Sequence, residues 1–194
     1  MSAVNAPFGF RPVRTVAGTA PQIQAYKGGL ASGAAVTLFK GTPIAFDTSG
    51  RLTVAPDTGA LAGVFDSVFY IDASGNPQAQ NFWVSGTTVQ AGSVVTVYWV
   101  DGNNTIFQVQ AAGSIPLTSV YATADLEAAS KVSGSTLTGL STARLSTTVA
   151  ATNAAAQWRI MGPAAIQGNA IGDAFTVVEV RLNQYQAAFG GNSV

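Results

Sequence analysis

The stretch Val94-Val-Thr-Val-Tyr-Trp-Val100, followed by Asp101-Gly-Asn-Asn104 and Thr105-Ile-Phe-Gln-Val-Gln110, decides the fold. Its first run is β-branched and aromatic and is apolar on both faces, which predicts a strand between packed layers. Asp, Gly and Asn tolerate positive φ, so the middle of the stretch predicts a tight turn. The last run is again rich in β-formers. We therefore expect a central hairpin, with the other strands folded around it.

Short apolar runs separated by turn residues recur on both sides of this hairpin. The clearest runs are Ala35–Phe39, Ile44–Phe46, Arg51–Val54, Ser67–Ile71 and Ala174–Leu182. No window carries a convincing helical stripe, and the best helical candidate, residues 123–131, supports at most a turn or two. The pattern predicts an all-β fold of about ten short strands in a single β-barrel or β-sandwich domain. The sequence leaves barrel and sandwich open.

The chain divides into three predicted parts, because its first and last residues differ in pattern from the rest. Residues 1–24 contain three prolines and predict an extended N-terminal arm. Residues 25–186 predict the β-rich domain, and residues 187–194 a flexible C-terminal tail. Phe8 and Phe10 are large apolar groups within the arm. They predict that it docks into a groove, either on its own domain or on a neighbour.

The composition suits either a protein that packs against neighbours or a low-charge secreted domain. Only 9% of the residues are charged, against about 25% in ordinary globular proteins. Nine basic and nine acidic residues give a net charge of zero. Nucleic-acid binders cluster Lys and Arg, so we expect no nucleic-acid partner. No apolar run approaches the roughly 20 residues that span a bilayer, so we expect no membrane partner either.

Cysteine and histidine are both absent from the sequence. Disulfides, cysteine nucleophiles, thiolate metal sites and histidine general bases are therefore excluded. We expect no cofactor, no metal site and no catalytic residues, which predicts that the chain is not an enzyme.

Other candidate groups have plain structural interpretations. Most acidic residues lie beside Gly, Ser or Asn, where a carboxylate accepts hydrogen bonds from backbone amides of a turn. The three tryptophans lie in apolar strands, which favours core positions over a sugar-stacking platform. Arg159, Glu179 and Arg181 lie on late strands and predict a cross-strand ion pair. Arg11 and Arg14 lie in the arm, and we expect them to contact an acidic partner surface.

Several segments resemble a family of structural proteins of tailed bacteriophages. The opening Asn5-Ala-Pro-Phe-Gly-Phe-Arg-Pro-Val-Arg14 is similar to the "NAPFGxRPVR" start of that family and is the most specific match. Shorter resemblances follow in order along the chain, at residues 38–44, 61–65, 105–110, 155–162 and 178–184. Gln108 departs from the family pattern, which often has Glu there, and residues 184–185 depart where His-Gln is common.

The resemblance implies a virion component, a capsid cement (decoration) protein that binds between major capsid protein subunits and stabilises the head. It places the protein on the capsid surface, and in the host cytoplasm during assembly. It also suggests a homo-oligomer, with a trimer as one form, since shells offer threefold positions. Phe8, Phe10, Arg11 and Arg14 are the expected partner-contact residues. The alternative is a phage head-fibre or tail structural protein that binds host-surface carbohydrate.

Overall fold

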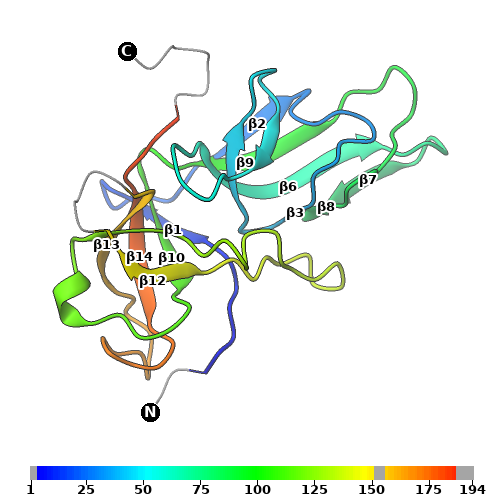
Figure 1. The fold of residues 1–194 in the computed structure, drawn as a ribbon. Helices are drawn as coiled ribbons and strands as arrows, with labels where there is room; N and C mark the ends of the chain where they lie inside the picture. The colour runs from blue at the N-terminus through cyan, green and yellow to red at the C-terminus, as the bar shows by residue number, and fades with distance from the viewer. Residues whose placement is uncertain (1–3, 151–155, 187–194) are drawn as a thin grey trace.

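The computed structural model describes residues 4–150 and 156–186, and its regular structure is almost entirely antiparallel β-sheet (Figure 1). One short 3-10 turn, η1 (Leu117–Ser119), is the helical element in these residues. The all-β prediction is confirmed, and the paired antiparallel sheets are consistent with a β-sandwich. Fourteen strands occur in the described residues, more than about ten, because several are only two to four residues long.

The first sheet contains six strands in the order β1-β10-β14-β13-β11-β12. Their bounds are β1 (Arg11–Thr15), β10 (Thr105–Gln110), β14 (Val177–Leu182), β13 (Trp158–Pro163), β11 (Thr123–Leu126) and β12 (Leu145–Val149). An additional bridge joins Ala111, just after β10, to Leu145 of β12, so the sheet curls around its own core. The inward-facing side chains come from alternate residues of each strand, as the two-residue period of a strand requires.

The second sheet runs in the order β2-β9-β6-β4-β5, and β7 also pairs with β6. Their bounds are β2 (Ile23–Lys27), β9 (Thr96–Asp101), β6 (Gly63–Ile71), β4 (Pro43–Phe46), β5 (Leu52–Val54) and β7 (Pro77–Gln80). A small third sheet pairs β3 (Leu38–Phe39) with β8 (Phe82–Trp83).

The predicted central hairpin is wrong, because β9 and β10 belong to different sheets. β9 pairs with β2 and β6, whereas β10 pairs with β1 and β14. The turn between them does have the predicted chemistry, since Asp101 Oδ1 accepts a hydrogen bond from the Asn103 backbone N–H at 2.8 Å. The segment from β1 to β2 makes the same passage between sheets alongside it (Figure 1).

The hydrophobic core has two clusters, one for each large sheet. Leu61, Val64 and Val100 come from the part of the chain that forms the second sheet, yet they pack in the cluster of the first. Backbone hydrogen bonds also join the two parts, such as Leu61 N–H to Gln184 O, just after β14, at 2.9 Å. The predicted core positions of the three tryptophans are confirmed, because Trp83, Trp99 and Trp158 are at most 5% exposed.

The expected N-terminal arm is extended, but part of it is a strand of the domain. Arg11–Thr15 form β1, which pairs with β10 at the edge of the first sheet. The prolines did not prevent pairing, because Pro12 needs no backbone donor at an edge and a bulge follows it. The helical candidate at residues 123–131 begins as strand β11. The predicted tail, residues 187–194, lies outside the described residues.

Candidate functional site

The N-terminal decapeptide places its two phenylalanines in different surroundings. Phe10 is 0% exposed, and its ring stacks on Trp158 with centroids 4.5 Å apart. Its backbone N–H donates to Gly41 O at 2.9 Å. The structure therefore places Phe10 in the protein's own core. Of the two grooves considered for this residue, it occupies the one on its own domain.

Gly9 separates the two phenylalanines and has to be small. Its φ is +74°, in the region that favours glycine, and a Cβ built on it would lie 2.9 Å from both Gly41 O and the Ser141 Cβ. The backbone turns at this close approach. As a result Phe10 enters the core while Phe8 stays half-buried at the surface.

Phe8 and Arg11 lie together, as expected for a contact group. The Arg11 guanidinium carbon is 5.1 Å from the centroid of the Phe8 ring, a cation–π geometry. Arg11 Nη2 also donates to Gln108 Oε1 at 2.6 Å. Gln108 of β10 thus orients Arg11, and the Arg11 guanidinium packs against one face of the Phe8 ring.

An apolar hollow of about 170 Å³ lies beside this pair. Its walls are mainly hydrophobic, and the ion pair Lys40–Asp66, with Nζ and Oδ1 2.6 Å apart, stands among them. The lining residues are Phe8, Phe10, Arg11, Pro12, Lys40, Gly41, Val64, Phe65, Asp66, Val100 and Leu140. Because Lys40 and Asp66 are paired with each other and Arg11 is held by Gln108 and the Phe8 ring, the hollow is suited to an apolar side chain of a partner.

A loop rich in Ser, Thr and Gly carries two exposed leucines, one of which lines the hollow. Leu137 is 94% exposed, and Leu140, which lines the hollow, is 41% exposed. The loop is anchored on the domain: Asn81 Nδ2 donates to Thr138 O at 3.0 Å, and Lys40 N–H donates to Gly139 O at 2.9 Å. We call Phe8, Arg11, Leu137, Leu140 and the hollow the contact surface. Sequence reasoning missed both leucines, although a large apolar residue in a Ser/Thr/Gly stretch was a usable signal.

Arg14 forms an ion pair with Glu179 of β14. The predicted ion pair among Arg159, Glu179 and Arg181 is therefore wrong. Arg159 and Arg181 lie directly opposite each other on β13 and β14, and Glu179 lies opposite Gly162. A one-residue bulge between Ile160 and Gly162 sets this register, and no local sequence pattern reveals it.

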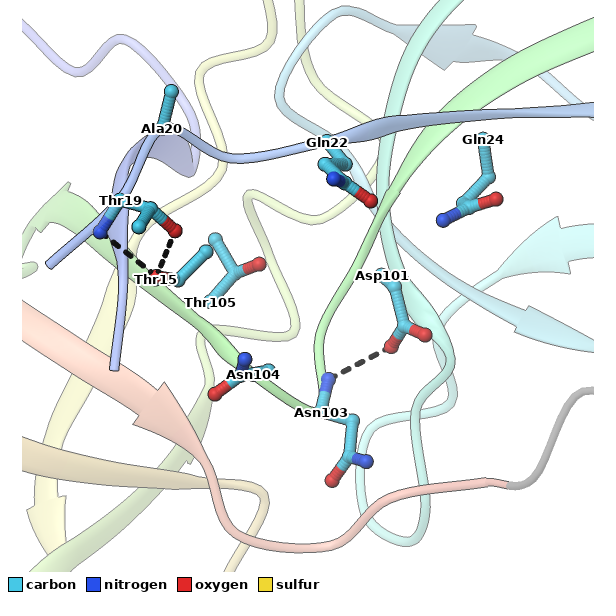
Figure 2. A pocket seen from close by; sticks show the side chains of 9 residues that line it. All are labelled: Thr15, Thr19, Ala20, Gln22, Gln24, Asp101, Asn103, Asn104 and Thr105. Atoms are coloured by element: carbon cyan, nitrogen blue, oxygen red, sulfur yellow. Dashed lines mark hydrogen bonds between the residues drawn. The ribbon is translucent and has the colours of Figure 1, made fainter. Parts of the chain in front are cut away.

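A second hollow, of about 260 Å³, lies where the chain passes between the sheets. Figure 2 shows the side chains of Gln22, just before β2, and Gln24, on β2, facing the segment that carries Asp101 and Asn103. Its lining is Thr15, Thr19, Ala20, Gln22, Gln24, Asp101, Asn103, Asn104 and Thr105. Among the described residues, the side-chain amides of Gln22, Gln24 and Asn103 form no hydrogen bond. This polar hollow can therefore offer hydrogen bonds to a neutral ligand.

Asp101 connects the polar hollow to the core through Tyr185. The Tyr185 hydroxyl donates to Asp101 Oδ2 at 3.4 Å. Burial of the hydroxyl and the neighbouring carboxylate charge raise the pKa of Tyr185 above its ordinary value, burial being the larger cause. The tyrosine therefore stays a neutral donor, and the carboxylate is held in place at the edge of the hollow.

The described residues contain no group of three or more His, Cys, Asp or Glu side chains placed to hold a metal ion. Within the same residues there is also no helix with the length and apolarity needed to cross a bilayer. Many of the acidic side chains have structural partners, as in the ion pair of Arg144 with Glu127 and the turn at Asp72.

Comparison of the chain with protein-family models, with curated proteins and with solved structures finds no match. Function is therefore inferred from the contact surface, the polar hollow and the composition, together with the resemblance of the N-terminal decapeptide.

Proposed function

We propose that this chain is a bacteriophage capsid cement (decoration) protein. In this role it binds between major capsid protein subunits on the outside of the head and stabilises the shell. It assembles in the host cytoplasm and remains on the capsid surface of the virion. The N-terminal resemblance suggests the class of protein, and the contact surface is the structural observation that carries the proposal.

The contact surface has the properties that such a role requires. Leu137 is 94% exposed, and it lies on the same loop as Leu140, which lines an apolar hollow of about 170 Å³. An exposed apolar side chain and an apolar hollow can each take part in an interface with a neighbouring subunit. Contacts of this kind depend little on salt, which suits a shell that must hold under changing ionic conditions.

Repetition would supply the strength that a single contact of this size lacks. A capsid presents the same seam many times, so modest contacts made by linked or neighbouring copies act at high effective concentration. A homo-oligomer, with a trimer as one form, would engage several subunits at once. The proposed role needs binding alone and no bond-making step.

The test uses purified heads that lack the protein, with loading measured by gel densitometry and by cryo-electron microscopy. Wild-type protein should load to saturation and raise the temperature at which the heads release their DNA. Leu137→Ser should weaken loading by about tenfold, since burying a leucine is worth about 1.5–3 kcal/mol. Val94→Ser, which changes a residue that is 58% exposed and lies outside the contact surface, is the matched control. Heads that do not take up the wild-type protein would contradict the proposal.

A second candidate function, a head-fibre or tail protein that binds host-surface carbohydrate, is favoured by the polar hollow. Side-chain amides pair well with sugar hydroxyls, because each offers a donor and an acceptor. A platform of tryptophans does not contribute, since all three are buried. Glycan-array binding that Asn103→Ala abolishes and Gln167→Ala leaves intact would favour this function. Gln167 is exposed and lies outside the hollow.

A further inference from the structure

We propose that Arg181 and Arg159, extended by Arg14, form a binding site for carboxylates on an acidic surface of a partner protein. We call these three residues the arginine row. The inference rests on the proposed function, which identifies the partner as a capsid subunit. It adds which chemical groups of that partner are bound. It starts from the register of the first sheet.

One residue from each of four neighbouring strands lies on a single line across the first sheet. Arg14 of β1 lies opposite Ile106 of β10, Ile106 lies opposite Arg181 of β14, and Arg181 lies opposite Arg159 of β13. Directly opposed residues of antiparallel strands project from the same face. The neighbours Trp158, Ile160, Val180 and Leu182 are buried in the core, so the arginines occupy the outer face. Three of the nine basic residues of a neutral chain thus share one line.

This arrangement is unfavourable for the isolated protein. Like charges directly opposite one another on neighbouring strands destabilise a sheet. The one acidic residue on the same face of β14, Glu179, is paired with Arg14. Arg159 reaches a neutral partner, Asn183 Oδ1, at 3.4 Å. Within the described residues, which include all nine Asp and Glu, the Arg181 guanidinium has no hydrogen bond or ion pair.

The two opposed arginines also border a hollow large enough for an acidic side chain. It measures about 370 Å³ and is lined by Arg159, Met161, Arg181, Leu182 and Asn183. A guanidinium presents parallel N–H groups that match both oxygens of a carboxylate. A carboxylate between Arg159 and Arg181 would therefore relieve their repulsion and gain charge-assisted hydrogen bonds.

The geometry favours carboxylates of a protein over a nucleic acid. Nucleic-acid affinity comes from many neutralised phosphates, whereas the arginine row offers two guanidiniums without a carboxylate partner and a third that Glu179 already neutralises. The net charge of zero adds no long-range attraction for a polyanion. Two or three Asp or Glu side chains on a capsid subunit would match the row.

The experiment measures binding of a capped hexaglutamate peptide by isothermal titration at low salt. Inorganic phosphate and a thymidine oligonucleotide serve as competing probes. Hexaglutamate should bind wild type, and Arg181→Gln and Arg159→Gln should each weaken binding by about tenfold, as expected when a charge-assisted hydrogen bond is lost. Arg51→Gln, which removes an arginine from a turn of the second sheet, should bind as wild type does. Affinity should fall as salt is added.

A second readout separates binding from folding. Because the two arginines repel each other, Arg181→Gln should melt at the same temperature as wild type or higher while it binds more weakly. Hexaglutamate binding that Arg181→Gln leaves unchanged would overturn the inference, as would tighter binding of phosphate or of the oligonucleotide. Head loading by the same variants separates the two proposals. If wild type does not load but hexaglutamate binding needs Arg181, the cement role fails and the carboxylate site stands.

Discussion

The ring of Phe10 stacks on the indole of Trp158 with centroids 4.5 Å apart and planes at 27°. Phe107 meets the same indole edge-on at 5.6 Å. The three rings come from β13, from β10 and from the segment before β1, and all are 0% exposed. The N-terminal segment is therefore part of the packing of the first sheet, because its aromatic ring fills the centre of that core.

Phe10→Ala should destabilise the protein by about 3–5 kcal/mol, since it removes a fully buried ring and leaves a cavity against Trp158. Urea unfolding followed by tryptophan fluorescence measures the change. Phe8→Ala is the matched control, with an expected loss of about 1 kcal/mol, because Phe8 is half-buried. Equal effects of the two substitutions would contradict the assignment of their surroundings.

Deletion of residues 1–20 should unfold the first sheet and is not a clean way to remove a partner contact. It takes away Phe10 and β1 and leaves the edge of β10 unpaired, although β10 is buried along its whole length. The sequence alone predicts an extended arm that lies outside the β-rich domain of residues 25–186. Circular dichroism and hydrogen exchange of the truncated chain measure the outcome. A cooperative unfolding transition at the wild-type temperature would contradict the prediction.

Gly63→Ala should be strongly destabilising, by about 2 kcal/mol or more, because the added methyl would overlap the Val100 carbonyl oxygen and lie 2.9 Å from Trp99 Cε3. The backbones of β6 and the β9 turn approach each other closely at this glycine. Gly113→Ala is the matched control, since its nearest neighbour would be Thr147 Cγ2 at 3.4 Å, an ordinary contact. Thermal melts of the two variants should therefore differ by several degrees.

The sequence predicted local features of the fold more accurately than the partners of its strands. The runs at residues 96–101 and 105–110 are both strands, and Asp101 accepts the expected turn hydrogen bond. The prediction of a hairpin is wrong because Asp, Gly and Asn suit a turn within a hairpin and a connection between two sheets equally well. Pairing of β10 with β1 and β14 depends on residues about 65 to 100 positions away, which no local pattern encodes.

The surroundings of the candidate contact residues also depend on the fold and could not be predicted from local sequence. Phe8 and Arg11, two of the four predicted partner-contact residues, lie together. Phe10 has the same residue type as Phe8, and only the turn at Gly9 sends it into the core. The arginine row depends on bulges in β1 and β13, each of which shifts the register by one residue. A single extra residue changes which side chains share a face, so composition and spacing could not place these charges.

Asp72→Asn should flatten the dependence of stability on pH in acid. The backbone N–H of Asn76 and the Gln78 side-chain amide donate to the Asp72 carboxylate and hold its pKa below the ordinary value of 3.8. A lowered pKa means that the ionised carboxylate stabilises the fold above the pKa of the unfolded chain. That contribution is lost as pH falls through the folded pKa. Urea unfolding from pH 6 down to about 2 measures it, and an NMR titration of Asp72 with a midpoint at or above 3.8 would contradict the prediction.

Arg14 and Glu179 should show a coupling energy of at most about 1 kcal/mol in a double-mutant cycle of Arg14→Gln and Glu179→Gln. The value stays modest because the Arg14 side chain is 44% exposed, although that of Glu179 is only 17% exposed. The coupling should shrink as salt is added, since exposed charges are screened. Lys131 and Asp57 provide the comparison pair, where the 60% exposed Asp57 side chain predicts a smaller coupling. Glu179→Gln alone should destabilise more than Arg14→Gln, because it leaves Arg14, Arg181 and Arg159 on one face with no negative charge among them. The reverse order would show that Glu179 does not offset the repulsion within the arginine row.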